Sequence, residues 1–198
     1  MDKVLSVERK NGVATVRFLS GETVRVPSAL YLERRLRAGD SADPAAYRMF
    51  ISQRGYPHAL ETAMKFLALR ERSEKEVRDR LRRSSYDAAS IQRVIDTLQL
   101  HGLLSDGRFA EQWVSSRSKK YGRGRIAQEL RVKGVSGQEA QQALNALPEE
   151  EEYRCAVEQG RKMARKFKND AKKITQALMR RGYGYALAKK AAEEAARD

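Results

Sequence analysis

The fold of this chain is decided by a nine-residue stretch, SEKEVRDRL at 73–81, which returns as GRGRIAQEL at 122–130 and as DAKKITQAL at 170–178. With their terminal leucines aligned, the copies lie 49 and 48 residues apart, and each has an apolar β-branched residue four positions before the leucine. A sequence that matches itself at a regular period of this length predicts tandem copies of one supersecondary unit.

Each copy is framed by residues that start and stop helices. Ser73, Gly122 and Asp170 stand eight residues before the leucine, at the position of a helix N-cap. Gly134 and Gly182 stand four residues after it, where a residue with positive φ ends a helix. Beyond each stop, apolar residues recur at i, i+3, i+4 and i+7, which is the spacing of one buried helix face. The pattern therefore predicts a middle helix, a tight stop and a third helix in every copy.

These observations place the chain in the mainly α fold class. A first helix in each copy is marked by an equivalent apolar residue, which is Leu60, Phe109 or Val157. We expect three tandem three-helix repeats at 57–105, 106–148 and 149–198. A unit of roughly 48 residues buries little core by itself, so the repeats are expected to stack into an elongated curved body.

The N-terminal segment 1–56 follows a different pattern. Valines alternate with polar residues through 3–27, as in half-buried strands, and Asn11-Gly12 is a signal for a two-residue hairpin turn. Pro27 ends the third strand. The segment therefore predicts a small β-meander.

Helices are expected to follow the meander. Leucines and the glycine after them predict a helix at about 29–38 that is closed by Gly39. A polar hinge at 40–44 leads to a second helix at 44–54, which is expected to end before Pro57.

Composition narrows the class of protein. The 198 residues include 40 Lys and Arg against 26 Asp and Glu, and the formal net charge of +14 favours nucleic acid, an acidic protein or a membrane surface as partner. No apolar run is long enough for a transmembrane helix, and no signal peptide follows Met1, so we expect a cytoplasmic chain without a membrane partner. The single cysteine, Cys155, suits a reducing compartment.

No residue pattern of an enzyme or a metal site is found in the sequence. The two histidines, His58 and His101, have no cysteine cluster beside them, so neither a metal nor another cofactor is expected. Neither a Ser/His/Asp set nor a glycine-rich phosphate loop is present. We therefore expect a binding protein with no catalytic residues.

Three basic clusters hold the candidate binding residues. The first cluster, on the middle helix of the first repeat, is Lys75, Arg78, Arg80, Arg82 and Arg83. Its neighbours Glu74, Glu76 and Asp79 favour a solvated helix face with i, i+4 ion pairs, for example between Glu76 and Arg80.

The second and third clusters have fewer acidic neighbours. The second cluster is Arg117, Lys119, Lys120, Tyr121, Arg123, Arg125, Arg131 and Lys133. The third cluster is Arg161, Lys162, Arg165, Lys166, Lys168, Lys172, Lys173, Arg180 and Arg181, with Phe167 among them. Because cations that neutralise phosphates release counterions, both clusters are predicted to bind DNA or a filament on DNA. Solvated helix faces are the alternative.

The acidic run at 149–152 follows Pro148. Carboxylates are favourable in the first turn of a helix, so we interpret the run as the start of the third repeat. A contact for a basic partner surface is the alternative.

Three motifs carry a resemblance to a known family. They are SEKEVRDRL at 73–81, GLLSD at 102–106 followed by Arg108-Phe109-Ala110, and YGRGRI at 121–126 leading to Leu130 and Gly134-Val135. In these motifs the chain resembles the bacterial RecX family of recombination regulators, over about 57–198. It departs from the family pattern at three positions. Ser105 stands where the family usually has an acidic residue, Ser85 stands where glycine is common, and Gly124 stands where proline is common.

The resemblance implies a regulator that is no enzyme. RecX proteins consist of three tandem three-helix repeats and bind the RecA recombinase and its filament on DNA. They inhibit its ATP hydrolysis and strand exchange in homologous recombination, DNA repair and the SOS response. The resemblance thus implies the RecA filament as partner of a monomeric chain. It supplies no binding residues, so the candidates above follow from charge alone.

Two other functions are weighed against this one. A stand-alone protein that binds single- and double-stranded DNA without sequence specificity would use the same basic clusters. The second and third helices of a repeat could also form a helix-turn-helix. The candidate reading helix at 136–147 has Gln138, Gln141 and Gln142 but no Arg or Lys, which disfavours base-specific reading.

Overall fold

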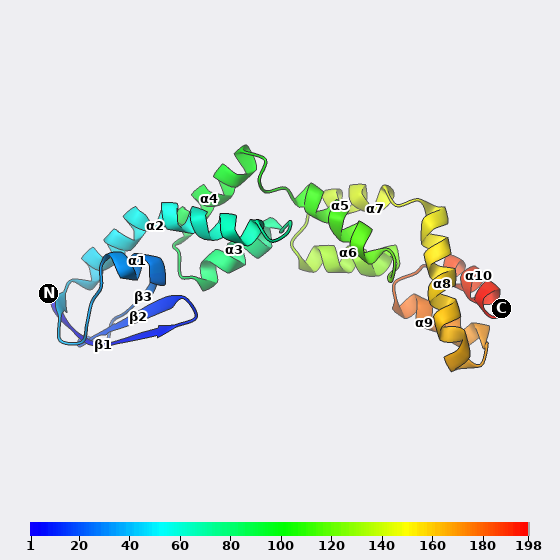
Figure 1. The fold of residues 1–198 in the computed structure, drawn as a ribbon, viewed down its shortest axis with the longest axis horizontal. Helices are drawn as coiled ribbons and strands as arrows, with labels where there is room; N and C mark the ends of the chain where they lie inside the picture. Colours follow the sequence, from blue (N-terminus) through cyan, green and yellow to red (C-terminus); the bar gives the residue numbers. More distant parts are fainter. Residues whose placement is uncertain (198) are drawn as a thin grey trace. The chain divides into compact units, whose positions relative to one another are not determined.

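The computed structural model describes residues 1–197 and divides into two compact units, Met1–Leu104 and Ser105–Asp198 (Figure 1). Each unit is described by itself below. The fold is mainly α, as predicted, with a small antiparallel sheet at the start of the first unit. Among the described residues, no helix has the length and apolar character needed to cross a membrane.

The sheet contains the predicted meander and one further strand. The meander consists of β1 (Asp2–Lys10), β2 (Val13–Phe18) and β3 (Thr23–Pro27). Asn11 and Gly12 have φ of 52° and 80°, as the predicted two-residue hairpin turn requires. The additional strand β4 (Ser41–Ala42) lies in the predicted hinge and pairs with β1, which gives the strand order β3-β2-β1-β4.

The first predicted helix is shorter than expected. Helix α1 (Ser28–Glu33) ends at Arg34, whose φ of −134° and ψ of 80° leave the helical region. The prediction that Gly39 closes this helix is wrong. Gly39, with φ of 94°, belongs to a later turn, in which its amide donates to the carbonyl of Val4 at 2.8 Å.

The second helix is longer than expected. Helix α2 (Pro44–Leu67) continues through Pro57 instead of ending at 54. Proline removes one backbone hydrogen bond, but packing outweighs this loss because Ile51, Gly55, Ala59 and Ala63 line one buried face. The proposed start of the first repeat at 57 therefore lies inside a helix.

Within residues 1–197, nine helices form three successive three-helix sets. The first contains α2, α3 (Glu74–Arg83) and α4 (Ala88–Leu100), and the second contains α5 (Asp106–Arg117), α6 (Arg123–Val132) and α7 (Gly137–Asn145). The third contains α8 (Glu149–Phe167), α9 (Ala171–Arg180) and α10 (Tyr185–Ala195). Ser73, Gly122 and Asp170 are the N-caps of the middle helices, as predicted.

The middle helix of each set ends in the same hydrogen-bonded motif. Ser85, Gly134 and Gly182 have φ of 65°, 85° and 89°. The amide of the residue that follows each of them donates to the carbonyl of the repeat leucine, at 3.3, 3.1 and 3.2 Å. These contacts define a Schellman motif, in which a left-handed residue reverses the chain.

Each stop also closes a small apolar contact. The residues after the left-handed position, Tyr86, Val135 and Tyr183, are buried, and the three repeat leucines have no exposed surface. An apolar contact commonly accompanies a Schellman motif. The sequence pattern at these positions therefore specifies both the end of the middle helix and the buried residues next to it.

Backbone segments of the second and third sets meet within the second unit. The amide of Gly122 donates to the carbonyl of Arg181, and the amide of Gly124 donates to that of Gly182, both at 3.0 Å. A Cβ atom on Gly122 would lie 2.5 Å from the carbonyl carbon of Gly182. Glycine at these positions therefore allows the start of α6 to touch the stop of α9.

We predict that Ser85→Gly raises the free energy of unfolding of the first unit by about 1 kcal/mol, because a non-glycine residue pays to adopt positive φ. The buried Ser85 hydroxyl also has no hydrogen-bond partner among the described residues. Urea unfolding followed by circular dichroism measures the change. Ser84→Gly is the control, because Ser84 has φ of −80° and glycine gains nothing there. Equal effects of the two substitutions would contradict the explanation.

Candidate nucleic-acid interface

Arg117, from the second cluster, is held inside the second three-helix set. Its Nε and Nη2 atoms donate to the carboxylate of Glu129 at 2.8 Å each, and Trp113 Nε1 donates to the same carboxylate at 3.1 Å. Hydrogen bonding to Glu129 raises the pKa of Arg117, and hydrogen bonds from Arg117 lower the pKa of Glu129. The positive charge of Arg117 and the negative charge of Glu129 largely cancel. Arg117 therefore holds the second three-helix set together through Glu129.

Arg123 joins the second and third sets. Its Nε lies 3.0 Å from the Glu152 carboxylate, and its backbone amide donates to the same carboxylate at 3.0 Å. Its Nη2 atom donates to the carbonyl of Leu147 at 2.6 Å. Glu152 has only 8% of its side chain exposed, so removing either partner would leave a buried charge unpaired.

Arg181 takes part in the same junction. Its Nη1 donates to the side-chain oxygen of Gln159, and Gln159 Nε2 donates to the carbonyl of Lys119 at 3.0 Å. Gln159 is buried. One donor of the Arg181 guanidinium is thus occupied by Gln159.

The rings in the basic clusters are covered by cations. The guanidinium carbons of Arg117 and Arg125 lie 4.6 and 5.0 Å from the centroid of Tyr121. Lys166 Nζ lies 5.8 Å from the ring of Phe167, and Lys133 Nζ lies 5.0 Å from that of Trp113. Stacking of a base on Tyr121 would have to displace these contacts.

Ion pairs divide the remaining cations into two groups. The paired cations are Arg125 with Glu129 at 3.3 Å, Arg161 with Glu194 at 3.7 Å, Lys162 with Glu158 at 2.6 Å and Lys173 with Asp170 at 3.4 Å. Apart from Lys166, which lies near the ring of Phe167, seven exposed cations of the second and third clusters have no carboxylate of the described residues within salt-bridge distance: Lys119, Lys120, Arg131, Arg165, Lys168, Lys172 and Arg180. We call these seven the unpaired basic set.

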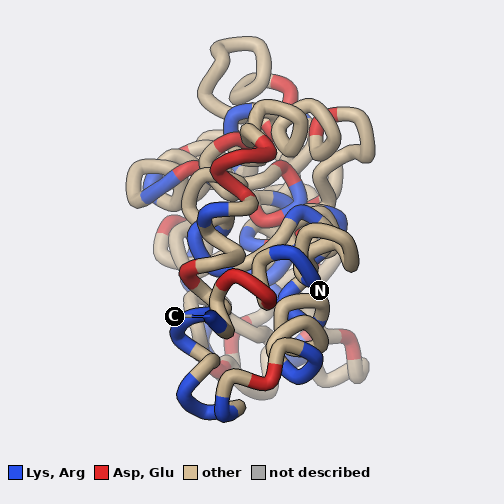
Figure 2. The backbone as a smooth tube through the Cα atoms, turned by 90° about the vertical axis from the view of Figure 1, so that its right-hand side faces the viewer, with Lys and Arg blue, Asp and Glu red and all other residues tan. Residues whose placement is uncertain are grey.

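Three members of this set surround the turn between α8 and α9. Lys168 and Asn169 have φ of 51° and 57°, so two consecutive residues adopt the left-handed conformation there. Arg165 precedes the turn on the last turn of α8, and Lys172 follows it on the first turn of α9. In Figure 2, Lys and Arg positions lie along much of the chain, interspersed with Asp and Glu positions, and several gather near the C-terminal label.

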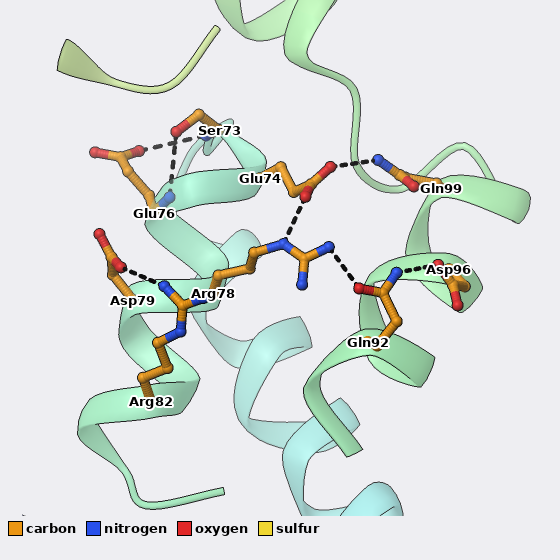
Figure 3. A network of polar contacts seen from close by, with 9 residues as sticks. All are labelled: Ser73, Glu74, Glu76, Arg78, Asp79, Arg82, Gln92, Asp96 and Gln99. Carbon is orange, nitrogen blue, oxygen red and sulfur yellow. Dashed lines mark hydrogen bonds and ion pairs between the residues drawn. The ribbon is translucent and has the colours of Figure 1, made fainter. Parts of the chain in front are cut away.

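Part of the first cluster is paired, as its acidic neighbours predicted (Figure 3). Arg78 Nε lies 2.5 Å from Glu74, and Arg78 Nη2 donates to Gln92 at 2.9 Å. The carboxylate of Asp79 lies 3.5 Å from Arg82. The predicted pair of Glu76 with Arg80 is wrong, because Glu76 instead lies 3.1 Å from Arg70, outside the helix.

Sequence reasoning missed the partners that hold Arg123 and Arg181. Glu152 belongs to the acidic run, which begins α8 as predicted, but its contact with Arg123 spans 29 residues of sequence. No sequence signal distinguished Glu152, because the four glutamates at 149–152 are alike in sequence and its burial depends on tertiary contacts. Gln159 gave no signal, since an isolated glutamine on a helix has no preferred partner.

Comparisons with known proteins agree on one family. Residues 59–98 match the family model "RecX, first three-helix domain", and residues 105–144 match "RecX, second three-helix domain". Regulatory protein RecX of Amycolatopsis mediterranei is 35% identical over 140 residues, which cover 67% of this chain and 80% of the relative. That of Clostridium botulinum is 28% identical over 199 residues, 96% of this chain and 94% of the relative.

Solved structures share the fold. A crystal structure of RecX from Lactobacillus salivarius aligns with a TM-score of 0.66 at 24% identity, and covers 72% of this chain and 97% of that chain. A crystal structure of a regulatory protein RecX aligns with a TM-score of 0.67 at 19% identity, over 98% of this chain and all of that chain.

We predict that Glu129→Gln lowers the free energy of unfolding by about 1–2 kcal/mol at pH 7, because Arg117 loses a charged partner. Since the pKa of Glu129 is lowered in the folded protein, its contribution is present above the unfolded pKa of about 4.3 and is lost as the pH falls through the folded pKa. The difference in the free energy of unfolding between wild type and Glu129→Gln should therefore become smaller below about pH 4.

Urea unfolding at pH 7 and at pH 3.5 tests this expectation. Glu158→Gln serves as the control, because the ion pair of Glu158 with Lys162 is largely exposed and its loss should change stability little. A difference for Glu129→Gln that stays constant across this pH range would contradict the assigned role.

Proposed function

The chain belongs to the RecX family, and from this premise we propose that it regulates homologous recombination and DNA repair by binding the RecA recombinase and its filament on DNA. In this proposal it inhibits the ATP hydrolysis and strand exchange of the recombinase. The support is threefold: the family of regulatory proteins to which the chain belongs, the repeated helical architecture, and the unpaired basic set.

The unpaired basic set is the observation that carries the DNA-binding part of the proposal. A cation that already faces a carboxylate gains little from a phosphate, because the phosphate must compete with the internal partner. An exposed cation without such a partner gains the full counterion release. The set includes Lys119, Lys120 and Arg131 on the second three-helix set and four members on the third, so both sets would contact the phosphate backbone.

The set refines the candidate residues of the second and third clusters. Arg117, Arg123 and Arg181 are fixed by Glu129, Glu152 and Gln159, so they are proposed as positioning residues. The paired cations are proposed to contribute little. Tyr121 and Phe167 are proposed to support the neighbouring cations rather than to stack on bases.

A stand-alone DNA-binding protein without sequence specificity is the second candidate. It is favoured by the same basic set and by the lack of cations on α7, whose sequence is GQEAQQALN. Such a protein would inhibit a recombinase only by occupying its DNA, whereas a filament regulator would act on the recombinase itself.

We predict that the full chain lowers the DNA-dependent ATPase of RecA at substoichiometric ratios, and that inhibition persists when DNA is in excess. ATP hydrolysis is followed while the chain is titrated at two DNA concentrations. Inhibition that requires saturation of the DNA, or that disappears when DNA is added, would favour the stand-alone protein and rule out the filament regulator.

We also predict that neutralising the unpaired cations at the α8–α9 turn weakens DNA binding more than neutralising paired ones. The test variant is Arg165→Gln/Lys168→Gln/Lys172→Gln, and the matched control is Arg161→Gln/Lys162→Gln/Lys173→Gln. The slope of log affinity against log salt should become shallower by about 2–3 in the test variant and by less in the control. Fluorescence anisotropy with a labelled oligonucleotide provides the slopes, and equal slopes would contradict the assignment.

A further inference from the structure

A basic groove lies in the first unit, lined by the β1–β2 hairpin, β3 and the C-terminal end of α3. Its volume is about 760 Å³. Five cations line it: Lys10, Arg25, Arg80, Arg82 and Arg83. Glu8 is the one carboxylate among its lining residues, so the lining has a formal net charge of +4, from five cations against one carboxylate. Neither the second nor the third cluster contributes to this groove.

The register of the sheet places the cations on its polar face. Glu8 pairs with Thr15, and Thr15 pairs with Arg25, so these three residues form a row across the strands. Successive residues of a strand point to opposite faces, and the neighbouring Val16 and Val24 are buried in the core. The apolar face therefore packs inside the unit, and the polar face, with Lys10 and Arg25, borders the groove.

The helix contributes its last turn. Arg80, Arg82 and Arg83 are exposed at the end of α3, just before the left-handed residue Ser85. Arg83 Nε donates to the backbone carbonyl of Asp79 at 3.0 Å, and no carboxylate of the described residues lies within salt-bridge distance of Arg83.

The charges of this turn are only weakly compensated. Arg82 lies 3.5 Å from the Asp79 carboxylate, and 65% of its side chain is exposed. Arg80 has no carboxylate of the described residues within salt-bridge distance. Cations that line one groove repel one another where salt does not screen them, over a Debye length of about 8 Å at physiological salt, and a bound anion relieves this repulsion.

We propose that this groove binds the phosphate backbone of duplex DNA. Charge complementarity identifies a polyanion, and the exposed lining offers several cations side by side, not one buried recognition group for a small ligand. Asn11, Thr15 and Ser84 add polar groups for phosphate oxygens. The lining residues include no aromatic side chain, whereas proteins that hold single strands use aromatic rings to stack the bases.

The groove assigns a role to the N-terminal sheet. The hairpin provides one wall and α3 the other, so duplex binding here depends on both parts of the first unit. This inference goes beyond the proposed function, since it assigns duplex DNA to a site in the first unit that contains no member of the unpaired basic set.

The test compares Lys10→Gln/Arg25→Gln with the control Lys3→Gln/Arg35→Gln in the full chain. All four side chains are exposed, and the control pair lies outside the groove lining. Binding of a labelled 20-base-pair duplex is measured by fluorescence anisotropy across a salt series. The affinity of the groove variant should be about tenfold lower at low salt. Its slope of log affinity against log salt should be shallower by about 1.8, as expected for two lost phosphate contacts. The control should keep the wild-type slope.

The same titrations with a 20-nucleotide oligo-dT strand and with inorganic polyphosphate identify the ligand class. A larger loss for the duplex than for either other probe supports the proposal. Equal losses for all three would overturn the assignment to duplex DNA, as would unchanged duplex binding in a variant whose melting temperature matches wild type. Because the ATPase of RecA is absent from these measurements, failure of the proposed function and failure of this proposal are distinguishable.

Discussion

A left-handed residue after the middle helix of each three-helix set is the constraint on which the rest of the structure depends. At Ser85, Gly134 and Gly182 the chain reverses, and the next amide bonds back to the carbonyl of a fully buried leucine. This reversal lets the third helix cover the same apolar core as the middle helix. In the third set the left-handed residue has a second role. Because Gly182 has no side chain, the start of α6 lies directly against it, and the amide of Gly124 donates to the Gly182 carbonyl.

The same geometry separates cations held in internal contacts from cations that stay exposed. Where the second and third sets meet in the second unit, cations bind partners inside the protein. Arg123 pairs with Glu152, and Arg181 donates a hydrogen bond to Gln159. At the α8–α9 turn and on the last turn of α3, no comparable junction exists among the described residues, and cations stay exposed. The cations behind the net charge of +14 therefore include a few fixed guanidinium groups and a larger number of exposed groups that a polyanion can reach.

What the sequence predicted correctly is local. Helical periods, N-caps and helix stops depend on residues a few positions apart, so three repeats and the Asn11-Gly12 hairpin were predictable. The passage of α2 through Pro57 and the pairing of β4 depend on tertiary contacts, which single-sequence patterns do not contain. The same limit applies to the site: charge density found the second and third clusters, but could not tell Arg123 from Arg165, or place Lys10 opposite Arg80.

The continuous apolar core of the first unit determines when this unit can fold during synthesis on the ribosome. Buried residues from Val4 in the sheet to Leu104 after α4 belong to one apolar cluster, and α2 crosses the join between sheet and helices. A nascent chain on the ribosome therefore cannot complete this apolar cluster until α4 has emerged. Synthesis and folding of this unit are coupled over its whole length, and the second unit, with its own cores, folds afterwards.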